Sequence, residues 1–180
     1  YESIAIDMMD VDFNLLIGGG KKYFERRKSD SFNLINLLSA KGYLVKDYFE
    51  VDFNSYKILA GKKFCYFTAD GEPLPAMRGR DYLSKATRDG IDFLHNVGTK
   101  GFFLTIEAGQ IDWGGHDNVG EYIVTEMLDF NKAIKDALAF ALKDKTTLII
   151  VTGDHETGGF SILPGSEIGK LNTAFTTKKH

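Results

Sequence analysis

The chain has 180 residues and a formal net charge of −3; 43% of its residues are hydrophobic and 26% are charged. These values are close to those of an ordinary globular protein, and the length suits one domain with a sizeable core. Because acidic and basic residues are interspersed, the composition argues against a dedicated nucleic-acid binder, which would carry a basic face or tail. No apolar run approaches the roughly 20 residues that a membrane span requires. The chain opens at Tyr1 without an initiator Met or a signal peptide, as expected of a mature form or an excised fragment.

The first half of the chain predicts short strands alternating with helices. Apolar runs bounded by turn residues predict strands at residues 14–17, 43–45 and 56–59. Helical spacing of apolar residues predicts helices at residues 29–41 and 81–97, the first capped by Ser29, Asp30 or Ser31. The glycines of residues 18–20 precede Lys21 but lack the spacing of a phosphate-binding loop, so they are interpreted as a structural turn.

The second half predicts one regular unit. Residues 101–106 and 147–151 are nearly continuous apolar runs, as expected of strands buried on both faces. Between them, residues 121–143 carry apolar side chains every three or four positions, which predicts a long amphipathic helix. Strand, helix and strand in this order predict a βαβ unit in a parallel sheet. The expected fold class is therefore α/β, a three-layer α/β/α arrangement with a mainly parallel sheet.

Polar residues that can bind metal follow both of these predicted strands. Glu107, Asp112 and His116 come after the first, and Asp154 and His155 come after the second. Because ligand sites in open parallel sheets lie beyond the carboxyl ends of the strands, these side chains are expected to meet at one end of the sheet. Carboxylate and imidazole groups together suit Zn²⁺ or another borderline divalent ion.

Each of these residues also has a simpler interpretation. A lone Asp-His pair is more often a turn with an exposed imidazole, and the spacing of Asp112 and His116 fits two ligands only if their loop is helical or tightly turned. Trp113 could shield a metal pocket, stack on a substrate or serve in buried packing. The single cysteine, Cys65, lies in an apolar run and is interpreted as a buried, unreactive thiol. The metal interpretation depends on the two motifs occurring together.

The two motifs also carry a resemblance to a known family. Residues 107–116 read EAGQIDWGGH, and residues 147–159 read TLIIVTGDHETGG, with the long predicted helix between them. This combination resembles the metal-binding half of the alkaline phosphatase family, and residues 16–24 and 41–43 resemble the segment that precedes it. The resemblance covers nearly the whole chain, so residues 1–180 are expected to form a single partial alkaline phosphatase domain.

The resemblance implies two zinc sites and one magnesium site. It matches Asp112 and His116 to ligands of the first zinc, and Asp154 and His155 to ligands of the second. It matches Glu107 to a ligand of the magnesium. His180, in a threonine-rich segment, is the candidate for the third protein ligand of the first zinc.

The implied activity is hydrolysis of phosphate monoesters, in a periplasmic or extracellular protein that could form a homodimer. The nucleophilic Ser of the family precedes the matched region, and Asp30-Ser31 falls at a position that does not correspond to it, so no nucleophile is assigned. The chain alone is therefore expected to lack activity and to hold metal poorly. The alternatives are a phosphomutase or sulfatase of the same superfamily, or a non-catalytic metal-binding fragment.

Overall fold

The computed structural model describes residues 1–59, 61, 63–167 and 169–177. The chain's contacts divide it into two compact units: Tyr1–Pro73 with Lys85–Leu104, and Leu74–Ser84 with Thr105–His180. The expectation that residues 1–180 belong to one partial domain stays a prediction.

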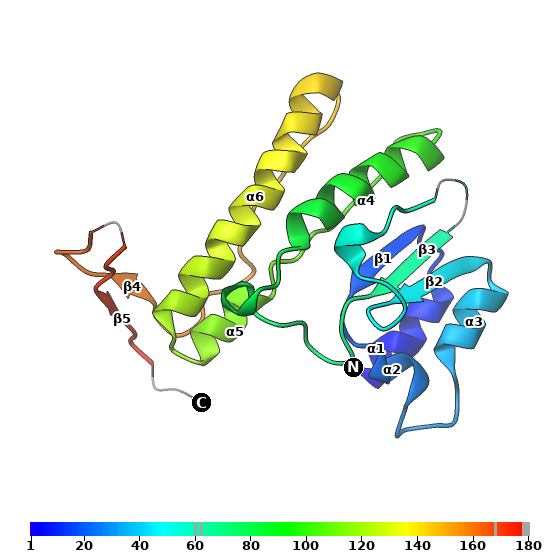
Figure 1. Ribbon diagram of the computed structural model, residues 1–180, viewed down its shortest axis with the longest axis horizontal. Helices are drawn as coiled ribbons and strands as arrows, with labels where there is room; N and C mark the ends of the chain where they lie inside the picture. Colours follow the sequence, from blue (N-terminus) through cyan, green and yellow to red (C-terminus); the bar gives the residue numbers. More distant parts are fainter. Residues whose placement is uncertain (60, 62, 168, 178–180) are drawn as a thin grey trace. The chain divides into compact units, whose positions relative to one another are not determined.

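The first unit is built on a parallel sheet of three strands. In sheet order these are β1 (Leu15–Gly18), β3 (Lys63–Phe67) and β2 (Tyr43–Asp47) (Figure 1). Leu16 of β1 and Val45 of β2 both lie opposite Cys65 of the central strand. From Phe64 to Phe67, β3 is almost completely buried, as a strand covered on both faces must be. Burial raises the pKa of the Cys65 thiol, which confirms the interpretation of an unreactive side chain.

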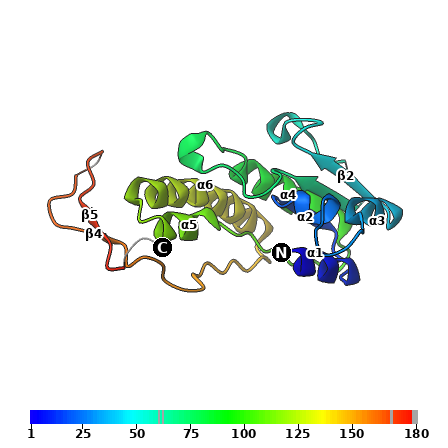
Figure 2. The same ribbon diagram turned by 90° about the horizontal axis from the view of Figure 1, so that it is seen from below.

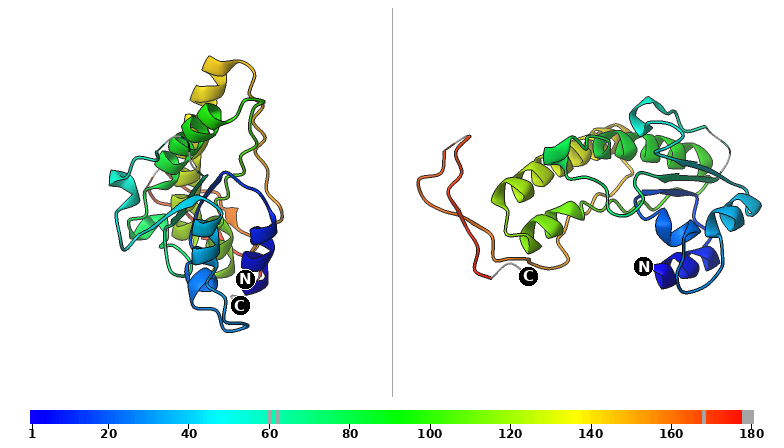
Figure 3. Two further views of the ribbon diagram at one scale, coloured as in Figure 1. Left: turned by 90° about the vertical axis from the view of Figure 1, so that its right-hand side faces the viewer. Right: turned by 60° about the horizontal axis from the view of Figure 1, so that its bottom comes forward.

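Helices cover both faces of this sheet (Figure 3). Cys65 and Phe67 pack on one side, in a core shared with α1 (Glu2–Asp7), α2 (Lys22–Glu25), α3 (Leu34–Ala40) and the 3₁₀ turn η1 (Met8–Asp10). On the other side, Phe64 and Tyr66 contact the rings of Tyr56 and of Phe53, which begins the 3₁₀ turn η2 (Phe53–Ser55). Helix α4 (Leu83–Val97) lies on this second side, where Gly90 packs close to Leu15. The expected α/β class with helices on both faces of a parallel sheet is therefore confirmed.

Two local predictions for the first half are wrong. Helix α3 begins at Leu34 because Asn33 is the N-cap, its side chain accepting from the Asn36 amide at 3.0 Å. None of the three expected caps, Ser29, Asp30 and Ser31, caps this helix, and Asp30 pairs instead with the Arg27 guanidinium. Residues 56–59 are not a strand: the Tyr56 ring stacks on Phe64 with centroids 5.6 Å apart, and the strand itself comes later, at Lys63.

The second unit centres on two adjacent helices, α5 (Gln110–His116) and α6 (Gly120–Asp144) (Figure 2). The 3₁₀ turn η3 (Ala76–Arg78) packs on α6, and a short antiparallel pair, β4 (Ser161–Ile162) and β5 (Thr173–Ala174), follows later in the chain. The prediction of a long helix at residues 121–143 is confirmed to within one residue at each end. Within the described part of the chain, no helix is long and apolar enough to cross a membrane.

The two buried strands expected in the second half are not formed. Residues 101–106 and 147–151 form neither helix nor strand, and they pair with no strand among the residues that the structure describes. Alternate apolar side chains in these runs are exposed, at 90% for Phe103, 81% for Leu148 and 78% for Ile150, and the apolar residues between them are half-buried. A strand forms only where another backbone completes its hydrogen bonds, and an apolar run does not supply that partner. The prediction of a βαβ unit is therefore wrong.

Candidate metal centre

Asp112 and His116 lie one turn apart on helix α5. Residues four positions apart face the same side of a helix, and here Asp112 Oδ2 is 3.4 Å from His116 Nε2. Both side chains are partly exposed, at 39% and 49%. The helical conformation that this pair requires is therefore present. Trp113 between them is 42% exposed, which contradicts a buried packing role.

Helix α5 is held in place by α6. Seven residues that include two glycines would not form a stable helix in isolation. The Tyr122 hydroxyl of α6 donates a hydrogen bond to the buried Gln110 side chain, and burial raises the pKa of Tyr122. A side chain at Gly114 would approach Ile123 to within 2.9 Å, so the close packing of the two helices requires glycine there.

Asp154 and His155 lie in a loop rather than at the end of a strand. Asp154 Oδ2 is 3.3 Å from His155 Nε2, and the two side chains are 88% and 58% exposed. His155 Nδ1 faces the backbone oxygen of Glu156 at 3.2 Å. This second carboxylate–imidazole pair is thus close to solvent.

Thr157 links the two pairs. Its hydroxyl donates a hydrogen bond to Asp112 Oδ1 on α5, and the same oxygen lies 3.1 Å from His155 Nδ1. The four motif residues therefore form one connected network, although the loop positions differ from the expected strand ends. Sequence reasoning missed Thr157, because nothing distinguishes its hydroxyl except its place between Asp154-His155 and a pair of glycines.

Two candidates stand outside this network. Glu107 is exposed, and its carboxylate folds back towards Gly109. His180 lies outside the described residues. Among the residues that are described, no three His, Cys, Asp or Glu side chains are grouped closely enough to hold a metal ion. The structure therefore contains two linked pairs of candidate ligands, and their roles stay predictions.

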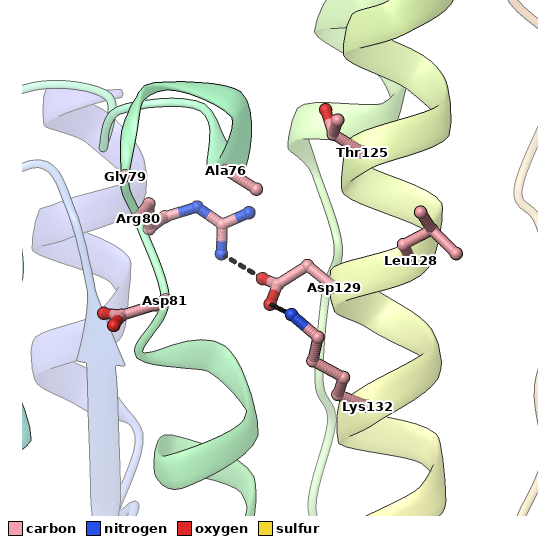
Figure 4. A pocket seen from close by; sticks show the side chains of 8 residues that line it. All are labelled: Ala76, Gly79, Arg80, Asp81, Thr125, Leu128, Asp129 and Lys132. Atoms are coloured by element: carbon pink, nitrogen blue, oxygen red, sulfur yellow. Dashed lines mark hydrogen bonds and ion pairs between the residues drawn. The ribbon is translucent and has the colours of Figure 1, made fainter. Parts of the chain in front are cut away.

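A separate cavity of about 380 Å³ lies against α6 (Figure 4). At its edge Arg80 donates to Asp129 at 3.0 Å and also pairs with Glu126, and both carboxylates are at least 97% buried. Lys132 reaches Asp129 from the exposed side, at 3.8 Å. None of the candidate metal ligands that the structure describes lines this cavity. Since Arg80 is balanced by two buried carboxylates, the arrangement anchors the Leu74–Ser84 segment to α6.

Comparison with known proteins agrees with the motifs. A family model described as "Alkaline phosphatase" matches residues 1–180. Alkaline phosphatase 3 of Bacillus subtilis is 39% identical over 168 residues, which cover 89% of this chain and 35% of that protein. The solved alkaline phosphatase of the Antarctic bacterium TAB5 is 37% identical, with a TM-score of 0.85, over 98% of this chain and 53% of that one. A variant of the TAB5 enzyme, 36% identical with a TM-score of 0.82 over the same shares of the two chains, is described with Mg bound in its M3 site.

These matches cover only part of each relative. The chain spans about a third of the length of the Bacillus relative and about half of the solved TAB5 chain. The residues that the family model matches, 1–180, include both polar motifs. The chain belongs to the alkaline phosphatase family.

Proposed function

We propose that this chain supplies metal ligands to an enzyme that hydrolyses phosphate monoesters. The observation that carries the proposal is the linked pair of carboxylate–imidazole sites, Asp112 with His116 and Asp154 with His155. Membership of the alkaline phosphatase family supports the reaction class.

The donor atoms of the second pair suit a cation. The backbone oxygen of Glu156 can only accept a hydrogen bond, so His155 Nδ1, which faces it, carries a hydrogen. In the neutral ring, Nε2 then holds a lone pair beside the Asp154 carboxylate. In this tautomer the Nε2 lone pair and the Asp154 carboxylate lie side by side, and Zn²⁺ takes this combination of nitrogen and oxygen ligands.

The proposed assignment follows the family resemblance. Asp112 and His116 would bind the first zinc with His180 as a third ligand, and Asp154 and His155 would bind the second. Glu107 would bind magnesium, which a TAB5 relative is described as holding. When bound, such ions stabilise the attacking and leaving oxygens of phosphate transfer and lower the pKa of bound water. The residues of this chain hold and orient those ions, and no serine in it is assigned as the nucleophile.

Further features of the proposal rest on family membership alone. We propose that residues 1–180 belong to one larger domain, and that the enzyme acts in the periplasm or outside the cell. Association as a homodimer belongs to the same proposal. The exposed apolar runs at residues 101–106 and 147–151 suit a chain whose sheet is completed by further polypeptide.

A non-catalytic metal-binding fragment is the second candidate for the isolated chain. The absence of an assigned nucleophile among the residues of this chain favours it. A phosphomutase or sulfatase is less well supported, since the matches reported above are all alkaline phosphatases.

Turnover of a chromogenic phosphate monoester tests the proposal. The assay compares this chain with a version extended upstream, each with Zn²⁺ and Mg²⁺, and a chromogenic sulfate ester serves as the control substrate. We expect phosphate release from the extended version and none from the isolated chain. Preference for the sulfate ester, or an inactive extended version that is folded and loaded with metal, would overturn the proposal.

A further inference from the structure

We propose that Thr157 is a positioning residue, which holds the Asp112 carboxylate and the His155 imidazole in the orientation in which they bind metal. The inference rests on the proposed function, because it concerns the same metal ligands. It adds a residue that carries neither a carboxylate nor an imidazole and binds no metal itself.

The geometry joins two segments that are far apart in the chain. The Thr157 hydroxyl donates to Asp112, which lies 45 positions earlier, and its oxygen is 3.1 Å from His155 Nδ1. One side chain therefore contacts a candidate ligand from each motif. Carboxylates and imidazoles that bind metal commonly depend on such hydrogen bonds from outside the ligand set.

Counting hydrogens defines the direction of each contact. Thr157 has a single hydroxyl hydrogen, and the Asp112 carboxylate can only accept it. The Thr157 oxygen must then accept from His155, so His155 Nδ1 carries the hydrogen in this contact. The contact with the Glu156 backbone oxygen independently requires the same tautomer. In the neutral ring, both contacts therefore leave Nε2 as the atom with the lone pair.

Packing fixes where the hydroxyl points. A side chain at Gly115 of α5 would lie 2.7 Å from the Thr157 backbone oxygen and 2.9 Å from its Cγ2 methyl. The Thr157 backbone and methyl therefore sit directly on α5, and a β-branched side chain has few χ1 rotamers to choose from. The following residue is also held, since Gly158 O accepts from the Thr176 and Thr177 amides at 3.1 and 3.2 Å.

The test uses two substitutions in the version of the protein that is extended upstream. Thr157→Val keeps the branched shape and removes the hydroxyl, whereas Thr157→Ser keeps the hydroxyl. Thr152→Val is the matched control, because the exposed Thr152 hydroxyl bonds only locally, to Gly153 O at 3.0 Å. NMR reports the χ1 rotamer of Asp112 without metal, and the His116 and His155 ring signals report Zn²⁺ affinity during a zinc titration.

In Thr157→Val we expect the Asp112 side chain to exchange among several χ1 rotamers, where the parent has one. We also expect Zn²⁺ binding to weaken by about 10- to 100-fold. Thr157→Ser and Thr152→Val should keep one Asp112 rotamer and stay within about threefold of the parent affinity. An unchanged Asp112 rotamer in folded Thr157→Val overturns the inference, and so does unchanged zinc affinity in that variant. If zinc shifts neither histidine ring in the extended parent protein, the proposed function fails, while the metal-free rotamers still decide whether Thr157 positions Asp112.

Discussion

The hydroxyl of Thr157 donates a hydrogen bond to the carboxylate of Asp112, although the two residues are 45 positions apart. Thr157 belongs to the loop that carries Asp154 and His155, whereas Asp112 shares helix α5 with His116. This one contact turns two separate polar motifs into a single site.

Replacing His116 by Ala should weaken zinc binding at the first site and lower the activity of the complete enzyme by orders of magnitude. The reason is that a ligand lost from a zinc site leaves an open coordination position and a poorly oriented ion. Zinc content after dialysis and phosphate release are the measurements. His95→Ala, on helix α4, is the control and should leave both unchanged. Full zinc content and full turnover in His116→Ala would show that His116 is not a zinc ligand.

Replacing Gly115 by Ala should lower the free energy of unfolding by about 1–3 kcal/mol through overpacking. The added methyl would meet the Thr157 backbone oxygen at 2.7 Å, and a backbone atom cannot move aside as a flexible side chain can. Gly153→Ala is the matched control, since its nearest neighbour would be 3.9 Å away. Denaturant unfolding of the two variants compares them directly. Equal stabilities would contradict the close packing of α5 against the loop.

The sequence predicted those features that depend on neighbouring residues. The long helix of residues 121–143 and the pairing of Asp112 with His116 follow from spacing along one chain segment, and both are present. Strands at residues 101–106 and 147–151 were not predictable in this way, because a strand requires a partner from elsewhere in the chain. The role of Thr157 could not be predicted from the sequence for the same reason, because its hydroxyl contacts a residue that is distant in the chain and adjacent only in the fold.

Replacing Arg80 by Ala should destabilise the protein by about 3–5 kcal/mol, because Glu126 would be left buried without a positive partner and Asp129 would keep only the exposed Lys132, at 3.8 Å. Lys132→Ala removes a positive charge from the same cluster, but this side chain is 66% exposed. Its effect should therefore stay within about 0.5 kcal/mol. Thermal or denaturant unfolding measures both. Similar losses of stability in the two variants would contradict the claim that Arg80 is the principal positive partner of the buried carboxylates.

The pair of Asp47 and Lys21 should make stability depend on pH in the acid range. Burial raises the pKa of Asp47, but the Lys21 ammonium at 2.8 Å and the Phe49 and Glu50 amides outweigh this effect, so the pKa lies below its ordinary value of 3.8. A lowered carboxyl pKa contributes stability that is present above the unfolded-state pKa and is lost as the pH falls through the folded-state pKa.

The stability advantage of the parent over Asp47→Asn should therefore be constant near neutral pH and shrink below about pH 4. Denaturant unfolding at a series of pH values measures it, with Asp10→Asn, which removes an exposed carboxylate, as the control. If the stability difference between the parent and Asp47→Asn instead grew as the pH fell, a lowered pKa of Asp47 would be contradicted.

The central claim is that Asp112, His116, Asp154 and His155 bind metal together. Anomalous X-ray diffraction at the zinc absorption edge, from crystals of the active, zinc-loaded enzyme that contains this sequence, tests it most directly. We predict two zinc peaks, one within bonding distance of Asp112 and His116 and the other within bonding distance of Asp154 and His155, at about 2.0–2.2 Å. Zinc peaks bound by other residues, with these four side chains free of metal, would contradict the account.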